Sequence, residues 1–243
     1  MKKTKIIVGL ALIFNMLLSM QNSYSQTAPV MRLNAKEQNL VSIGGLAAKG
    51  DLQRLKSQLE KGLNAGLTVN QIKESLIHVY AYAGFPRSIR ALQTFMTVID
   101  ERKARGIVDA DGIVASTIDT TEEKYERGKE VLKKLTGVRE NETKTGYAAF
   151  APIIEVFLKE HLFADIFERD VLNYSERELV TVAVLSSIGG VEPMLRSHLN
   201  ICLHLGLTSE QLQQCVDIIA TSVGEKEAEQ AHEVLNEVLL SKK

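Results

Sequence analysis

The side chains best suited to covalent or redox chemistry in this sequence are its two cysteines, Cys202 and Cys215. Their separation is far from that of a redox C-x-x-C motif. Each lies on the apolar face of a predicted helix, beside Leu203 and Val216, a setting typical of buried thiols. We therefore expect two buried thiols, with a disulfide as the alternative if the chain is exported.

The five histidines show no metal-binding pattern. His198 and His204 are six residues apart, which places them on different faces of a helix, and no H-x-x-x-H motif occurs. The sequence also lacks the glycine-rich motifs that hold nucleotides, and Ser186-Ser187 does not stand in a nucleophile elbow. We therefore predict neither a metal nor an organic cofactor.

The sequence contains an internal repeat, and the helices of this repeated segment must position the candidate side chains. Residues 33–41 match residues 172–180, and after a shift of one residue the similarity continues from residues 55–91 to residues 195–231. A unit of this length is too long for a short helical repeat and indicates a duplicated domain.

Each copy has the apolar spacing of four helices, and no segment alternates as a strand would. In both copies a glycine stands where a helix should end, and a threonine N-cap with a glutamine three residues later should begin the next helix. These residues are Gly66, Thr68 and Gln71 in the first copy, and Gly206, Thr208 and Gln211 in the second.

The predicted fold is all-α, with two tandem four-helix modules at residues 26–105 and 122–243. A linker rich in Asp, Gly, Ser and Thr joins them at residues 106–121. The second module is expected to begin with an N-terminal extension, made of helices at residues 122–135 and 152–167.

Residues 1–25 have the features of a secretory signal peptide. A basic start is followed by an apolar run at residues 6–20, and small residues, Ser23 and Ser25, occupy the positions that a signal peptidase recognises. We expect cleavage after Ser25 and a periplasmic or secreted mature protein that does not contact the membrane. An uncleaved anchor is the alternative, but the run is shorter than the ~20 residues of a span.

The composition suits a globular protein and argues against nucleic-acid binding. Hydrophobic residues make up 45% of the chain and charged residues 24%, while the formal net charge is −1. Tryptophan is absent and aromatic residues make up only 5%, so neither a basic field nor a base-stacking platform is expected.

Several stretches together resemble the carboxymuconolactone decarboxylase family, within the alkyl hydroperoxidase D-like superfamily. The second copy resembles the front of the family signature and the first copy its back half. The stretches are RELVTVA at 177–183, LRSHL at 195–199 and LGLT at 205–208, then GLT at 66–68, IKE at 72–74 and YAGFP at 82–86.

The resemblance implies an all-helical ring, usually a hexamer, which a two-copy chain would build as a homotrimer. The sequence adds an argument of its own, because residues 180–188 are apolar almost all round and must be covered on every side. We therefore expect a pseudo-hexamer with any active site near a subunit or repeat interface.

In the hydroperoxidase branch, the resemblance implies a C-x-x-C pair followed by a histidine, with a glutamate one helix earlier. None of the corresponding positions holds a thiol, which argues against peroxiredoxin-type peroxidase activity by that mechanism. They hold Val191, Met194, His198 and Glu178 in the second copy, and Asp51, Arg54, Gln58 and Asn39 in the first.

The decarboxylase branch implies cofactor-independent decarboxylation of a small carboxylated lactone or related acid. Such an enzyme must hold a carboxylate, stabilise an oxyanion and supply a proton. His198 is the candidate proton donor, Glu178 or Asp165 would orient or tune it, and Arg177 or Arg196 would balance the charge of the substrate.

A structural interpretation of His198 stands beside the catalytic one. His198 lies between Leu195 and Cys202 on an apolar face, as a hydrogen-bonded core histidine would, and Gln58 replaces it in the first copy. A non-catalytic ligand-binding or assembly protein on the same scaffold is therefore the alternative function.

The other candidates also have structural interpretations. Glu178 stands three residues after Ser175, as in a capping box, and Asp165 stands four residues after His161, as in a surface pair. The two arginines would be solvated unless an interface covers them.

Overall fold

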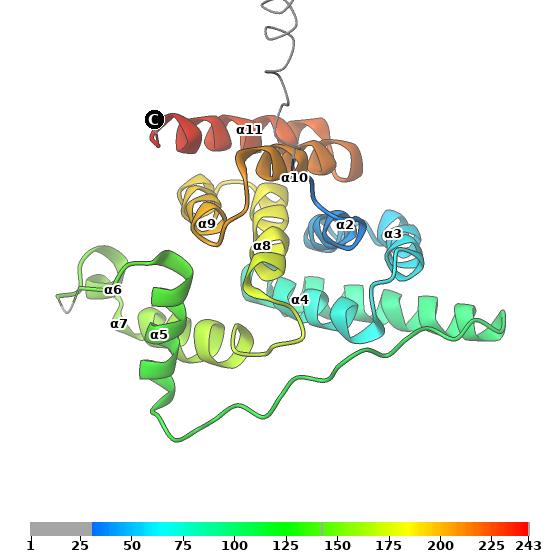
Figure 1. Cartoon of the computed structure of the whole chain (residues 1–243), viewed down its shortest axis with the longest axis horizontal. Coiled ribbons are helices and arrows are strands. Elements are labelled where there is room, and N and C mark those ends of the chain that lie inside the picture. Colours follow the sequence, from blue (N-terminus) through cyan, green and yellow to red (C-terminus); the bar gives the residue numbers. More distant parts are fainter. Residues whose placement is uncertain (1–30, 142, 243) are drawn as a thin grey trace, which may run out of the picture. The chain divides into compact units, whose positions relative to one another are not determined.

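The computed structural model describes residues 31–141 and 143–242, so the predicted signal peptide lies outside the described residues. All regular secondary structure in the described part is helical, as expected. The first copy comprises α2 (Ala35–Lys49), α3 (Leu52–Asn64) and α4 (Val69–Ala104). The second comprises α8 (Tyr174–Ile188), α9 (Glu192–His204), α10 (Ser209–Ser222) and α11 (Glu225–Leu240) (Figure 1).

Helix α4 is two helical segments that fold back on each other. Gly84 interrupts it with φ 79° and ψ 166°, a backbone conformation that favours glycine. The Ser88 hydroxyl donates to the Leu76 carbonyl at 2.8 Å, a contact that a straight helix would not allow. Each copy therefore has the four predicted helical segments, with the break after Ala83 corresponding to the break at Gly224 between α10 and α11.

The predicted threonine caps are confirmed, but the predicted cap of α8 is wrong. Thr68 and Thr208 each form a capping box with the glutamine three residues later. Helix α8 instead starts from Asn173, whose box partner is Glu176. Because the helix begins earlier than the Ser175 pattern implied, Glu178 is not a capping residue and its side chain lies in the interior.

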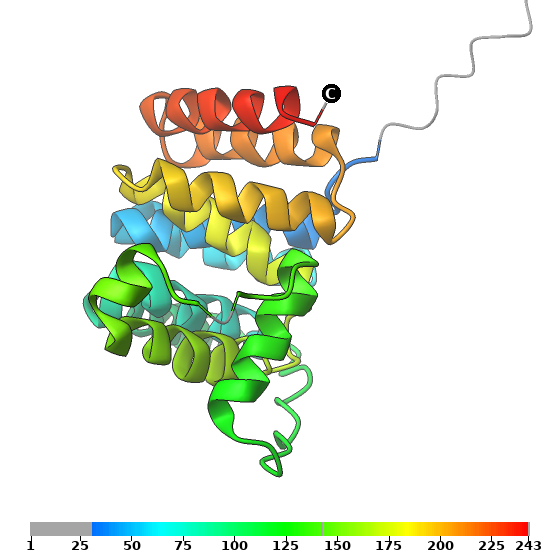
Figure 2. The same ribbon diagram turned by 90° about the vertical axis from the view of Figure 1, so that its left-hand side faces the viewer.

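The two copies pack against each other along α2 and α8, which contact each other closely. A Cβ atom on Gly44 of α2 would lie 3.1 Å from Val180 Cγ1, so a small residue is needed at this crossing. Figure 2 shows α2 and α8 between the α10–α11 pair on one side and α4 on the other. The apolar helix α8 is thus covered within one chain, and its coverage alone does not require a ring.

The segment between the copies contains α5 (Lys124–Thr136), α6 (Gly146–Phe150), α7 (Pro152–Phe157) and a π-helix, η1 (Leu158–Ile166). The helix expected at 152–167 therefore changes type after Phe157. Helix α5 approaches η1 so closely that a Cβ atom on Gly128 would lie 2.0 Å from the Lys159 carbonyl oxygen. This packing forms a separate small core around Leu135 and Phe167.

Cys202 and Cys215 are free, buried thiols, as the sequence favoured. Burial raises the pKa of Cys215 to about 12 and also raises that of Cys202. Neither is therefore suited to thiolate chemistry. Among the described helices, none is both long enough and apolar enough to cross a bilayer.

Candidate functional site

His198 and Glu178 form a hydrogen-bonded pair in the second copy. His198 Nδ1 on α9 lies 2.7 Å from Glu178 Oε2 on α8. The Glu178 side chain is fully buried, whereas 13% of the His198 side chain is exposed. Since an ionised carboxylate only accepts hydrogen bonds, His198 carries a proton on Nδ1, and Nε2 is left to accept or deliver a proton.

Tyr82 joins this pair from the first copy. It lies at the end of the first segment of α4, with its ring edge-on to His198 at a centroid separation of 5.6 Å. Its hydroxyl is buried and has no hydrogen-bond partner among the described residues. Burial and the charge of Glu178 raise the pKa of Tyr82, so the hydroxyl stays protonated and can act as a donor.

Arg177 is completely buried, because the interface between the two copies covers it. Its Nη2 lies 2.9 Å from Glu74 Oε1 of the first copy. Glu74 also binds Arg169, at 2.8 and 3.0 Å. Burial alone would raise the pKa of Glu74, but the hydrogen bonds from Arg169 and Arg177 outweigh it and hold that pKa below its usual value. The two guanidinium groups are thus balanced by two carboxylates, Glu74 and Glu178, and the site gains a net positive charge only when His198 is protonated.

His78 belongs to the same cluster, although no motif in the sequence indicates a role for it. Its Nε2 lies 2.8 Å from Thr181 Oγ1, whose own hydrogen is donated to the Arg177 carbonyl at 3.0 Å. His78 Nε2 must therefore donate to Thr181. Burial and then the charges of Arg177 and His198 hold the pKa of His78 well below its usual value, so His78 is neutral.

The signal for this cluster was present in the sequence as a spacing of four. Glu74, His78 and Tyr82 follow one another at intervals of four residues and therefore share one face of a helix. That face packs on α8, where Arg177, Glu178 and Thr181 are buried. The back half of the family signature in one copy thus meets the front half in the other.

In the related arrangement of the repeat, neutral side chains replace the ionisable cluster, and a guanidinium at its edge, that of Arg54, binds the Ser222 carbonyl at 3.0 Å. Gln58 Nε2 donates to Asn39 Oδ1 at 2.6 Å, in place of the histidine and glutamate pair. The repeat also replaces the remaining members of the cluster with residues that do not ionise. Gln38 corresponds to Arg177, Ser42 to Thr181, Gln214 to Glu74, Ile218 to His78 and Ser222 to Tyr82.

Asp165 and Arg196 are not brought to His198. Asp165 binds Lys124 at 3.0 Å and His161 at 3.2 Å, which is the surface pair that the spacing suggested. Arg196 pairs with Glu237, and 47% of its side chain is exposed. No group of three or more potential metal ligands is arranged around a common point in residues 31–141 and 143–242.

Comparison with known proteins agrees with this division into two copies. The model of the carboxymuconolactone decarboxylase family matches residues 24–95 and 156–237, more than half of the chain. The 4-carboxymuconolactone decarboxylase of Acinetobacter baylyi is 29% identical over 96 residues, which are 39% of this chain and 71% of that protein. An uncharacterized protein of Methanocaldococcus jannaschii is 32% identical over 71 residues, 29% of this chain and 66% of that protein. The chain therefore belongs to the carboxymuconolactone decarboxylase family and carries the family's domain twice.

Proposed function

We propose that the protein is an exported enzyme that decarboxylates a small carboxylated lactone or a related acid without a cofactor. The observation that carries this proposal is the pairing of His198 with buried Glu178 beside the unpartnered hydroxyl of Tyr82. Membership of a family whose Acinetobacter relative is named a decarboxylase supports the same reaction class.

The groups at the repeat interface suit the steps of such a reaction. When the bond to the carboxylate breaks, carbon dioxide leaves and the electron pair moves into a conjugated carbonyl, giving an enolate-like anion. The Tyr82 hydroxyl donates a hydrogen bond to the developing oxyanion. Protonated His198 then delivers the Nε2 proton to carbon, while Glu178 fixes the ring and stabilises its charged form.

The charge around the site favours an anionic substrate. Arg177 and Arg169 balance the carboxylates of Glu74 and Glu178, so the positive charge that remains for an anionic substrate is that of protonated His198. Because Arg177 is fully buried, its field is screened less than that of a surface arginine. A carboxylate entering beside Tyr82 and His198 would be attracted without displacing the Glu74 ion pair.

Release of carbon dioxide from 4-carboxymuconolactone and from a panel of related carboxylated lactones tests this function. The mature chain, starting at Gln26, should release carbon dioxide from at least one of them without added metal or cofactor. If it binds such acids but turns none of them over, a non-catalytic ligand-binding protein is the better description.

Export is proposed from the basic start, the apolar run and the small residues that precede Gln26. Mass spectrometry of protein recovered from the periplasm or medium should find a chain that begins near Gln26. Intact residues 1–25 on that material would contradict the proposal.

A further inference from the structure

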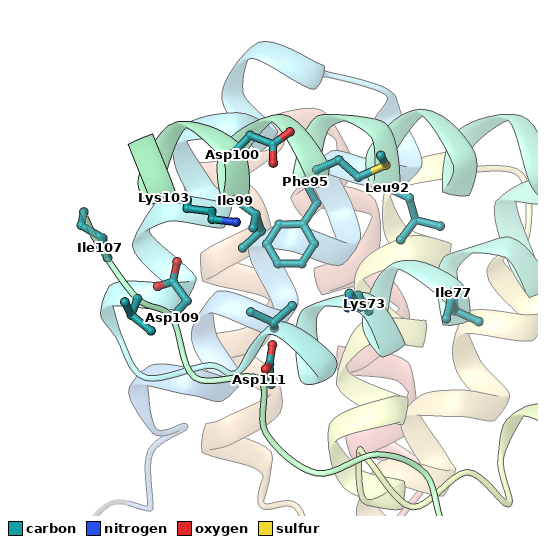
Figure 3. A pocket seen from close by; sticks show the side chains of 13 residues that line it. Lys73, Ile77, Leu92, Phe95, Ile99, Asp100, Lys103, Ile107, Asp109 and Asp111 are labelled. Carbon is teal, nitrogen blue, oxygen red and sulfur yellow. The ribbon is translucent and has the colours of Figure 1, made fainter. Parts of the chain in front are cut away.

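A concave site lies away from His198, in the first copy. It is a groove of about 660 Å³ between the two segments of α4 and the start of the linker (Figure 3). We call it the α4 groove. Its walls include Val69 and Ile77 from the first segment of α4, and Leu92, Phe95 and Ile99 from the second. These side chains give the groove a mainly aliphatic and aromatic interior.

The linker is fixed against α4 and forms one wall of the groove. Arg102 Nη2 binds Asp109 at 2.7 Å in a pair that is almost completely buried. The backbone N–H groups of Val69 and Asn70 donate to the carbonyl oxygens of Ala110 and Asp111, each at 2.9 Å. Since these bonds hold the linker in place, the α4 groove is formed before any ligand arrives.

The second copy offers an internal comparison, because it carries polar residues at the positions that match the apolar Ile77 and Leu92. Gln213, Asp217 and His232 stand where the first copy has Lys73, Ile77 and Leu92. Gln213 Nε2 lies 2.8 Å from His232 Nδ1, and His232 Nε2 lies 3.5 Å from Asp217 Oδ1. At these positions the same scaffold thus carries a hydrogen-bonded polar group in one copy and part of an apolar groove wall in the other.

The rim of the α4 groove has balanced charges. Lys73 and Lys103 stand at its edge together with Asp100 and Asp111, while the charge of Asp109 is matched by Arg102 (Figure 3). Two positive and two negative groups leave no net preference for an ionic ligand. The apolar interior therefore determines what the groove selects.

We propose that the α4 groove is a binding site for a small, uncharged hydrophobic molecule, separate from the His198 site. Its volume lies in the range of about 300–1,000 Å³ that is usual for small-molecule sites. The apolar walls supply the binding energy, and the fixed linker removes the cost of ordering a loop. This proposal does not depend on the decarboxylase function.

Fluorescence titration with the neutral probe N-phenyl-1-naphthylamine tests the proposal on the mature chain. We expect saturable binding of one probe per chain. The variant K73Q/I77D/L92H copies the polar residues of the second copy into the groove, and it should bind at least tenfold more weakly. Met96→Glu, at a groove position that is 65% exposed, should weaken binding several-fold without threatening the fold.

Val138→Ser is the matched control, because Val138 is a 67% exposed apolar side chain that does not line the groove. It should leave probe binding unchanged. Unchanged affinity in the triple variant, with native circular dichroism, would overturn the proposal; if that variant does not fold, unchanged affinity in Met96→Glu would do so. Absence of saturable binding to the wild type, as when a neighbouring subunit covers the groove, would also overturn it.

Discussion

His198 and Glu178 are joined across α8 and α9 by a hydrogen bond of 2.7 Å, and the first copy reproduces this contact with Gln58 and Asn39 at 2.6 Å. The geometry of the pair is thus kept in both copies, while ionisable groups are present in only one. The fold therefore accommodates a hydrogen-bonded pair between these two helices whether the pair is ionisable or neutral. The charged version adds a group that can transfer a proton.

The first prediction uses the first copy as a template for a neutral pair. The double variant E178N/H198Q should fold with stability close to that of the wild type, because an amide pair replaces the ion pair in the same geometry. His198→Ala should instead lose about 3 kcal/mol or more, since it leaves the buried Glu178 carboxylate without its partner. Urea unfolding of the three proteins measures the difference. A double variant less stable than His198→Ala would contradict the interpretation that a neutral amide pair can replace the ion pair at these positions.

The second prediction concerns the Tyr82 hydroxyl. Tyr82→Phe keeps the ring against His198 and removes a buried oxygen that has no hydrogen-bond partner among the described residues, so the stability should not fall. If the hydroxyl stabilises the oxyanion, kcat should drop about 10²-fold with a smaller effect on KM. Tyr80→Phe is the control from the same helix, because that hydroxyl binds His161 at 3.0 Å and should not affect kcat. Equal kcat values for the two variants would remove Tyr82 from the mechanism.

The third prediction follows from the neutral state of His78. Its pKa is held well below the usual 6.5, so below pH 6.5 the unfolded chain binds a proton that the folded chain does not. The free energy of unfolding should therefore fall with decreasing pH, by up to about 1.4 kcal/mol per pH unit for this group. Glu74, with a pKa held below 4.5, loses its stabilising effect only at lower pH.

Urea unfolding at pH 7.5 and 5.5 measures this effect of His78. His78→Gln should reduce the pH dependence, whereas His204→Gln, at an exposed position, should leave it as in the wild type. An unchanged dependence in His78→Gln would mean that other groups cause the loss of stability.

Local sequence patterns predicted the helical architecture well. The Thr68 and Thr208 caps, the duplicated units and the linker between them depend on neighbouring residues, which a sequence displays directly. The start of α8 was misjudged because Ser175 and Glu178 match a capping box as well as Asn173 and Glu176 do. Only the structure shows which of the two patterns forms.

The residues that form the site were harder to predict from the sequence, because the site depends on contacts between the two copies. His198 and Glu178 were identified and do meet, but Asp165 and Arg196 form surface ion pairs elsewhere. The burial of Arg177 required knowledge that α4 packs on α8. For the same reason, His78 looked like an isolated histidine until the repeat interface was visible.

The fourth prediction concerns assembly. Five large apolar side chains within α6 and α7 are well exposed in the single chain, and burying them would remove a sizeable apolar surface from water. We propose a homotrimer of two-copy chains that covers them, and light scattering of the mature protein should give the mass of three chains. A monodisperse monomer at micromolar concentration would contradict it. These side chains are Tyr147, Phe150, Ile153, Ile154 and Phe157.

The most direct measurement compares kcat/KM for decarboxylation in His198→Gln and Gln58→Ala, which change corresponding positions of the two copies. The proposed function predicts that His198→Gln loses about 10²- to 10⁴-fold, as expected when a general acid is removed. Gln58→Ala should stay within about twofold of the wild type, since no ionisable group of the site is changed. Full activity in His198→Gln, or equal losses in both variants, would contradict a proton transfer by His198 at the repeat interface.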